Sequence, residues 1–297
     1  SGTVRNLTVA GRFESVRSDD SEVHLGAFAA ETDNATIENC TNQAEIVVAD
    51  AADATSRTML LSGFVGKAFN GVTLRNCRNS GNISFSSPAL YMIGGFVGAV
   101  QEDDGLYTIA GCHNTADFSN AGSNSGWNFM GGIAGKTVSK QLVPGETSNY
   151  RLIVEECSST GTIGIAGPSK VRASGIVAHT QGAYRISGCS FSGTIESTDA
   201  TTRDVVIGGI VAMADKDCVG LVEGCTFSGR ISAAQAGANN YFGGIFGNNG
   251  GAASIVNDCR TTASAYVGCP KGGKSVGMLA GRPNKALSLI HISEPTR

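Results

Sequence analysis

Apolar and polar positions alternate in short stretches along this chain, and the same stretch returns at a nearly constant interval. The repeated unit contains an apolar residue, a cysteine three positions later, a small residue four positions after that, and a second apolar residue. It occurs at residues 37–46, 74–83, 109–118, 154–163, 186–195, 222–231 and 256–265, and with Leu7 in place of the cysteine at residues 4–13. Seven intervals separate Leu7 from Cys259, so the mean period is about 36 residues.

A second unit, centred on a glycine, alternates with the first unit, as in LSGFVGK around Gly63 and IGGFVGA around Gly95. The third residue after this glycine is small in every copy. It is Ala29, Gly66, Gly98, Gly135, Ala178, Ala212, Gly247 or Ala280. A small residue at a fixed place predicts that another part of the backbone packs closely there.

Side-chain parity predicts how each copy bends. Tyr184 and Ile186 share one parity, whereas Cys189, Phe191 and Ile195 share the other. Each arm therefore has the two-residue period of a strand, and the slip between Ile186 and Cys189 indicates a corner or bulge. We expect three short strands in each coil: one at the Gly-Gly segment, one ending at the cysteine corner and one after it.

These features predict an all-β fold, a parallel β-helix or β-solenoid of about eight coils, with the right-handed winding usual for parallel crossovers. The alternative is a set of antiparallel hairpins in a propeller or sandwich. Like residues at one position in successive copies favour stacked coils: Asn42, Asn79 and Asn114 in three copies, and Phe191 and Phe227 in two later copies.

The repeat divides the chain into two parts. Residues 1–285 are expected to form a single solenoid domain that continues beyond both ends. Residues 286–297 do not fit the repeat and look like a translated sequencing-adapter tail on a metagenomic read. We expect this tail to be artefactual or disordered and to lie outside the fold.

The alternating GGFVG-like units and units such as LRNCRNSGNI resemble the GLUG-type repeats of secreted surface proteins of Bacteroides-like gut bacteria and other bacterial adhesins. The resemblance covers residues 4 to about 281. It implies a β-helical adhesin or stalk at the bacterial cell surface or outside the cell, without a fixed catalytic motif. Copies four to seven depart from the Asn-x-Gly form, with Ser159, Phe191, Phe227 and Thr261 at the asparagine position.

Composition narrows the set of partners. The chain has 41 Gly and only 6 Pro, a net charge of -3 and no cluster of Lys or Arg. Nucleic acid is therefore not an expected partner, and no apolar run approaches the ~20 residues of a membrane span. The expected partners are glycans, cell-surface proteins and neighbouring repeats of the parent chain, and no cofactor is expected.

Seven cysteines recur once per coil: Cys40, Cys77, Cys112, Cys157, Cys189, Cys225 and Cys259. None forms the C-x-x-C pair of a zinc site, so we expect an inward stack of free thiols that pack as small apolar groups. Neighbouring coils would still bring stacked thiols within disulfide range. Cys218 and Cys269 fall outside the stack and are the better candidates for paired or reactive thiols.

Two sets of residues resemble parts of catalytic sites. GGIAGKT at residues 131–137 resembles a phosphate-binding loop, but Met130 stands where that loop needs its first glycine, so Lys136 is interpreted as part of the repeat. An enzyme acting on polysaccharides would need carboxylates from separate coils to converge. The acidic candidates are Asp19, Asp20, Glu22, Glu102, Asp103, Asp104, Asp215 and Asp217. The histidines are scattered and suggest no catalytic arrangement.

A binding surface is predicted at two long insertions, which precede Cys112 and Cys157 on adjacent coils. They are expected to stand side by side as a polar ledge formed by Glu102, Asp103, Asp104, Tyr107, Lys140, Glu146 and Tyr150. Trp127 follows a Gly/Ser-rich turn at another corner, where it would either stack on a sugar ring or pack over the edge of the solenoid. The predicted function is a structural or adhesive scaffold, and the alternative is a carbohydrate-active β-helix enzyme, a lyase or hydrolase.

Overall fold

The computed structural model describes most of the chain. It covers residues 2–15, 22–49, 58–101, 103–122, 124–139, 150–167, 170–198, 204–216, 218–234, 239–250, 253–270, 274–283 and 288–289. All regular elements within these ranges are strands. No helix in the described ranges is long and apolar enough to cross a membrane.

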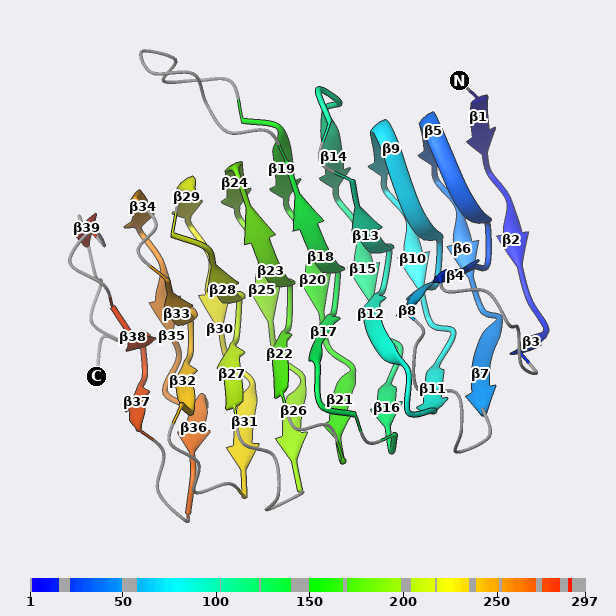
Figure 1. The fold of residues 1–297 in the computed structure, drawn as a ribbon. Coiled ribbons are helices and arrows are strands. Elements are labelled where there is room, and N and C mark those ends of the chain that lie inside the picture. Colours follow the sequence, from blue (N-terminus) through cyan, green and yellow to red (C-terminus); the bar gives the residue numbers. More distant parts are fainter. Residues whose placement is uncertain are drawn as a thin grey trace.

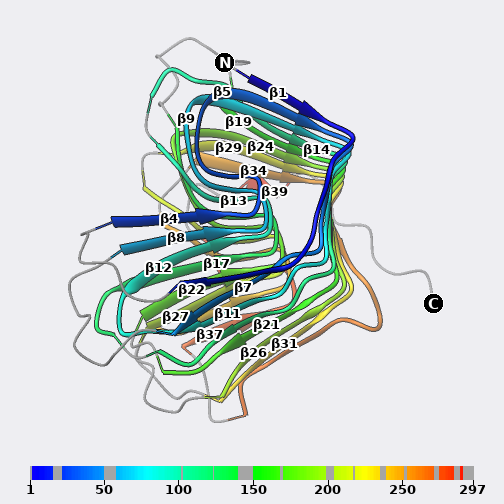
Figure 2. The same cartoon turned by 90° about the vertical axis from the view of Figure 1, so that its right-hand side faces the viewer.

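The strands form a parallel β-solenoid of about seven turns, in which every paired strand runs parallel to its neighbour in the next coil (Figure 1). Seen from the N-terminal end, the chain turns clockwise as it recedes, so the winding is right-handed (Figure 2). The predicted fold class is therefore confirmed, with about seven turns where the repeats predicted about eight coils. The propeller and sandwich alternatives are wrong, because they require antiparallel pairing.

Each coil crosses four sheets, which we name D, A, B and C in chain order. Sheet D consists of β4 (Glu22–Gly26), β8 (Thr58–Ser62), β12 (Leu90–Gly94), β17 (Trp127–Gly131), β22 (Lys170–Ser174), β27 (Asp204–Gly208), β32 (Tyr241–Gly243) and β37 (Ser275–Gly277). The first row of sheet A consists of β5 (Ala29–Glu38), β9 (Val65–Arg75), β13 (Val97–Val100), β18 (Ala134–Val138), β23 (Val177–Gln181), β28 (Val211–Ala214), β33 (Phe246–Asn249) and β38 (Ala280–Arg282).

Sheet A has a second row, which ends at the cysteine corner, and β5 and β9 are long enough to span both rows. The second row consists of β1 (Gly2–Arg5), β14 (Tyr107–Ala110), β19 (Leu152–Glu155), β24 (Ala183–Ser187), β29 (Val219–Glu223), β34 (Ala253–Asn257) and β39 (Ser288–Leu289). The pairing of β39 with β34 places two residues of the predicted tail on the solenoid.

Sheets B and C follow the corner. Sheet B consists of β2 (Thr8–Val9), β6 (Thr41–Asn42), β10 (Arg78–Asn79), β15 (His113–Asn114), β20 (Ser158–Ser159), β25 (Ser190–Phe191), β30 (Thr226–Phe227) and β35 (Arg260–Thr261). Sheet C consists of β3 (Arg12–Ser15), β7 (Glu45–Ala49), β11 (Ile83–Ser86), β16 (Phe118–Asn120), β21 (Thr162–Ile165), β26 (Thr194–Ser197), β31 (Arg230–Ala233) and β36 (Tyr266–Gly268). A coil such as β12 to β16 thus has five strands where the sequence predicted three, because the chain bends twice more than the parity pattern revealed.

One residue in the left-handed conformation makes each cysteine corner. It is Asn6, Asn39, Asn76, Gly111, Glu156, Gly188, Gly224 or Asp258, with φ between 48° and 61°. Glycine, and after it asparagine and aspartate, adopt this conformation with the least strain. The left-handed Gly188 lies between Ile186 and Cys189, which confirms the predicted parity slip and lets the side chains of both arms point inward.

Sheet B carries the predicted ladder of like residues inside the solenoid. The Nδ2 group of Asn42 donates to Oδ1 of Asn79 at 2.8 Å, and Nδ2 of Asn79 donates to Oδ1 of Asn114 at 2.8 Å. In later coils the rings of Phe191 and Phe227 stack with their centroids 6.1 Å apart. These contacts fix the register between coils, because a slip by one residue would turn the buried amides outward.

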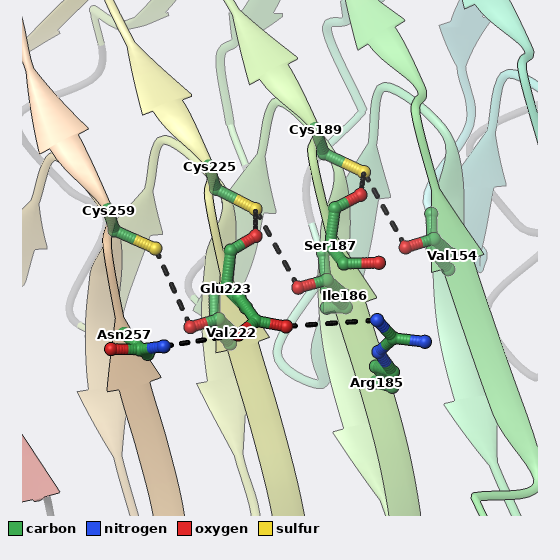
Figure 3. A network of polar contacts seen from close by, with 10 residues as sticks. All are labelled: Val154, Arg185, Ile186, Ser187, Cys189, Val222, Glu223, Cys225, Asn257 and Cys259. Atoms are coloured by element: carbon green, nitrogen blue, oxygen red, sulfur yellow. Dashed lines mark hydrogen bonds and ion pairs between the residues drawn. The ribbon is translucent and has the colours of Figure 1, made fainter.

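The repeated cysteines line the interior beside the corners, as predicted. All seven repeated cysteines are buried. The structure describes all nine cysteines of the chain, and none of them forms a disulfide. Each thiol of the row points at backbone carbonyls: Cys225 Sγ lies 3.4 Å from Glu223 O and 3.7 Å from Ile186 O in the coil before (Figure 3). Neither Cys218 nor Cys269 forms a disulfide, so the pairing alternative for these two thiols is wrong. Cys218 is buried with its thiol 3.4 Å from Thr180 O, and Cys269 is half-buried.

Candidate functional site

The solenoid has a re-entrant angle where sheet D meets the first row of sheet A (Figure 2). Glycines at this vertex let the backbone approach the opposite sheet B. A Cβ atom on Gly175 would lie 2.1 Å from the ring of Phe191, and one on Gly95 would lie 3.0 Å from the Asn114 side chain. The vertex therefore lies deep in the cross-section, and the outer faces of the two sheets face each other as the walls of a groove. Buried side chains, among them Phe129, His179 and Val206, fill this groove in the later coils.

The predicted small residues lie at this vertex. A Cβ atom on Gly98 would lie 2.9 Å from the carbonyl oxygen of Leu61, and one on Gly135 would lie 2.8 Å from that of Ile93. Both carbonyls belong to the sheet D strand of the preceding coil. The close approach expected from the sequence is therefore present, and it forms the floor of the groove.

Each coil contributes one residue in register to each wall, and we call the result the D–A groove. Its sheet D wall is the row His24, Leu60, Met92, Phe129, Arg172, Val206 and Tyr241. Its sheet A wall is the row Glu31, Lys67, Ala99, Lys136, His179, Met213, Asn248 and Arg282. Contacts cross from wall to wall: the Phe129 and His179 rings stack at 5.1 Å, and Arg282 Nη1 donates to Tyr241 Oη at 3.2 Å.

A hollow of about 320 Å³ opens in the D–A groove above Ala99. It is lined by Glu22, Leu60, Lys67, Met92, Ala99, Val100, Gln101, Lys136, Val138 and Gln181. The hollow exists because Ala99 stands in the wall between two lysines, Lys67 in the coil before and Lys136 in the coil after. Its volume is at the lower end of the roughly 300–1,000 Å³ typical of ligand pockets.

The two lysines of the hollow differ in their surroundings. The Lys67 ammonium lies 2.8 Å from Glu22 Oε1 and also faces the ring of Phe69 at 5.1 Å. The Lys136 ammonium is half-buried and lies 5.8 Å from the Phe129 ring, and it has no ion pair with any described residue. Burial, with the nearby charge of Arg172, lowers the pKa of Lys136, while the charge of Asp215 opposes the shift.

A polar cluster lies next to the hollow on the C-terminal side. Asp215 Oδ1 is 3.1 Å from Nε2 of His179 and 3.9 Å from Nη1 of Arg172, and Gln181 Nε2 donates to the other oxygen. Burial alone raises the pKa of Asp215, but the contacts with His179, Gln181 and Arg172 lower it to about 2. Burial lowers the pKa of His179 to about 4, so the imidazole is neutral at pH 7.

Trp127 is the first residue of β17 and lies at the outer edge of the sheet D wall. Its ring is half-buried, with the guanidinium carbon of Arg172 4.4 Å from the ring centroid and Lys170 Nζ 5.8 Å away. The arginine covers one face of the indole, which is consistent with edge packing, and stacking of this tryptophan on a sugar ring stays a prediction.

The predicted ledge of insertions differs in the structure. Asp103 accepts hydrogen bonds from the backbone N–H groups of Asn70 and Gly105 and from the hydroxyl of Tyr107, and the Tyr107 side chain is buried. These two residues therefore hold the loop. Asp103 is half-buried, and the buried Tyr107 does not offer its side chain to a ligand. Asp104 is exposed, and Tyr150 is half-buried. Glu102, Lys140 and Glu146 lie outside the described residues.

Other acidic and basic candidates are distributed differently from the sequence-based prediction. Glu22 lines the hollow and Asp215 joins the polar cluster, whereas Asp19, Asp20 and Asp217 lie outside the described residues. Lys136 lies in the same repeat position as Lys67, in agreement with its interpretation as part of the repeat. The repeat pattern does not reveal that this position faces the other sheet. Among the described residues, no three His, Cys, Asp or Glu side chains gather as a metal site.

The fold defines the class of protein as a parallel β-solenoid repeat protein, with a hollow between sheets D and A. A scan against protein-family models, a search of curated proteins and a search of solved structures found no match.

Proposed function

We propose that this protein is a cell-surface or secreted solenoid scaffold, related to GLUG-type repeat adhesins, that binds glycans along the D–A groove. The observation that carries the proposal is the hollow above Ala99, which joins apolar wall residues to charged and amide groups. Sugar rings present both apolar C–H faces and hydroxyls, and a pocket of this mixed lining complements both.

The shape of the groove supports a chain-like ligand. The residues that line the hollow come from several successive coils, which repeat every ~4.8 Å. A stretch of a linear polysaccharide in the hollow can therefore contact more than one coil. The groove replaces the inserted loops as the proposed contact surface, because Asp103 and Tyr107 are engaged in holding the first insertion.

The alternative, a carbohydrate-active enzyme, has less support. Glycoside hydrolysis by the common mechanisms uses two carboxylates on either side of the scissile bond. Of the residues that line the hollow, Glu22 is the one carboxylate, and it is paired with Lys67 at 2.8 Å.

A polysaccharide panel tests both functions together. The whole chain is incubated with plant, mucin and bacterial polysaccharides, and retention and new chain ends are scored in the same wells. We expect retention without new chain ends. Ala99→Leu fills the hollow and should weaken retention at least ~10-fold. Ser84→Leu adds the same volume at an exposed position of β11 and should leave retention unchanged.

Two results would contradict the proposal. Retention that survives Ala99→Leu would place the contact surface outside the hollow. New chain ends that disappear in Glu22→Gln would identify the protein as an enzyme.

A further inference from the structure

We infer that the hollow above Ala99 selects an anionic sugar residue, whose acidic group pairs with the Lys136 ammonium. This inference rests on the proposed glycan-binding function and names the class of ligand. It follows from three features of the hollow: its space, its unbalanced charge and its division into apolar and polar sides.

The space lies beside the ammonium. Lys67, Ala99 and Lys136 are in register on three successive strands, so the two lysine Cα atoms are roughly 10 Å apart with only a methyl group between them. Both lysine side chains and both neighbouring glutamines, Gln101 and Gln181, line the same hollow. A ligand that enters over Ala99 therefore meets Lys136 directly.

The charge in this part of the D–A groove is unbalanced. Glu22 neutralises Lys67 at 2.8 Å, and Asp215 faces Arg172 at 3.9 Å. His179 is neutral at pH 7, so it adds no charge. Lys136 remains as one cation in excess among the described groups of the hollow and its polar cluster. The charge of Asp215 acts on Lys136, but no described carboxylate makes an ion pair with it. A half-buried ammonium without an ion pair favours a ligand that supplies one.

The hollow has an apolar side and a polar side. Leu60, Met92 and Val138 offer apolar surface for the C–H face of a ring. Gln101 is exposed at the rim, where its amide is able to pair with ring hydroxyls. Gln181 is committed to Asp215. A small ring with one acidic group thus fits this lining better than a compact inorganic anion, which has no apolar face to bury.

The test compares acidic polymers with neutral partners of the same backbone. Binding of the whole chain is measured against polygalacturonate and its fully methyl-esterified form, and against a sulfated galactan and its desulfated form. We expect at least one acidic polymer to bind ~10-fold or more tightly than its neutral partner at low salt, with the difference shrinking as salt rises. The two pairs distinguish a carboxylate ligand from a sulfate ester.

Matched variants locate the effect. Lys136→Met removes the charge but keeps an unbranched side chain over Phe129, and it should reduce the preference for the acidic polymer to less than about twofold while neutral binding is unchanged. Arg78→Met removes one positive charge from an exposed position on β10 and should keep the full preference. Thermal unfolding midpoints of both variants check that each is folded.

The outcomes separate this inference from the function on which it rests. Equal binding of acidic and neutral polymers by the wild-type chain, or a preference that survives Lys136→Met, would overturn the anionic selectivity and leave glycan binding in place. Binding to neither member of either pair, together with no retention in the polysaccharide panel, would overturn both.

Discussion

Glu156 holds the left-handed corner position that glycine, asparagine or aspartate holds in the other seven coils, with a φ of 52°. A non-glycine residue in this region costs roughly 1 kcal/mol, and asparagine less than most. The backbone elsewhere in the corner is the same. Glu156 is therefore a place where the local conformation is maintained by the coil and not by the side chain.

We predict that Glu156→Asn raises the free energy of unfolding by about 0.5–1 kcal/mol, because the new side chain tolerates the same φ with less strain. Urea unfolding followed by circular dichroism measures the change. Glu155→Asn, one position earlier in the regular strand β19, is the control and should give no gain. A variant at position 156 that is no more stable than wild type would contradict the strain argument.

The buried imidazole of His179 makes stability depend on pH. Its pKa is lowered from 6.5 to about 4, mainly by burial and further by the charges of Arg172 and Lys136, while Asp215 opposes the shift. The unfolded chain therefore takes up a proton at a higher pH than the folded chain does. This contribution to stability is complete above about pH 6.5 and is lost as pH falls toward 4, by at most ~3 kcal/mol.

We predict that His179→Gln loses less stability than wild type between pH 7 and pH 4, measured as the change in urea midpoint over that range. Asp215 adds a separate loss at lower pH, as its carboxylate is protonated between about 3.8 and 2. His113→Gln, at a half-buried position on β15, serves as the control and should follow the wild-type curve. Parallel curves for His179→Gln and wild type would show that this histidine is not the source.

At the scale of the element, the vertex glycines decide how sheet D joins sheet A. We predict that Gly175→Ala lowers stability by about 1–3 kcal/mol, because its Cβ would lie 2.1 Å from the Phe191 ring. Gly164→Ala on β21 is the control, since its nearest contact would be an ordinary 3.7 Å. Combining Gly175→Ala with Phe191→Ser should cost less than the two single changes added together. Additive costs in this double-mutant cycle would show that the ring is not the obstacle.

Much of the structure of each coil could be predicted from the sequence, because residues that pack in the same way in every coil recur at the same repeat position. The cysteine spacing gives the period, the slip between Ile186 and Cys189 gives the corner, and the asparagine series gives the ladder at Asn79. The groove does not follow, since smallness at Gly98 shows that something packs closely but not from which direction the backbone comes. The burial of Tyr107 could not be predicted either, because an aromatic residue at the end of an insertion can lie on the surface or anchor the loop in the core.

At the scale of the whole molecule, each coil is buried by its neighbours. Val4, Leu7 and Phe13 are 37%, 47% and 40% exposed in the first coil, whereas Leu74 and Cys77, which occupy the first two of these slots in a central coil, are fully buried. The same residue slot is therefore surface or core according to whether another coil covers it. Stability accordingly grows with the number of coil-to-coil contacts rather than with a single central core.

The hollow exists because one slot of a regular wall, at Ala99, holds a residue smaller than those on either side. The backbone of β13 is the same as that of its neighbours. Equivalent positions on successive strands therefore differ only in their side chains. Exchanging Ala99 with Lys136 would move the ammonium by one strand, ~4.8 Å along the axis, without a change in the backbone. A solenoid backbone of this kind can therefore acquire a new pattern of ligand contacts through single substitutions at equivalent strand positions.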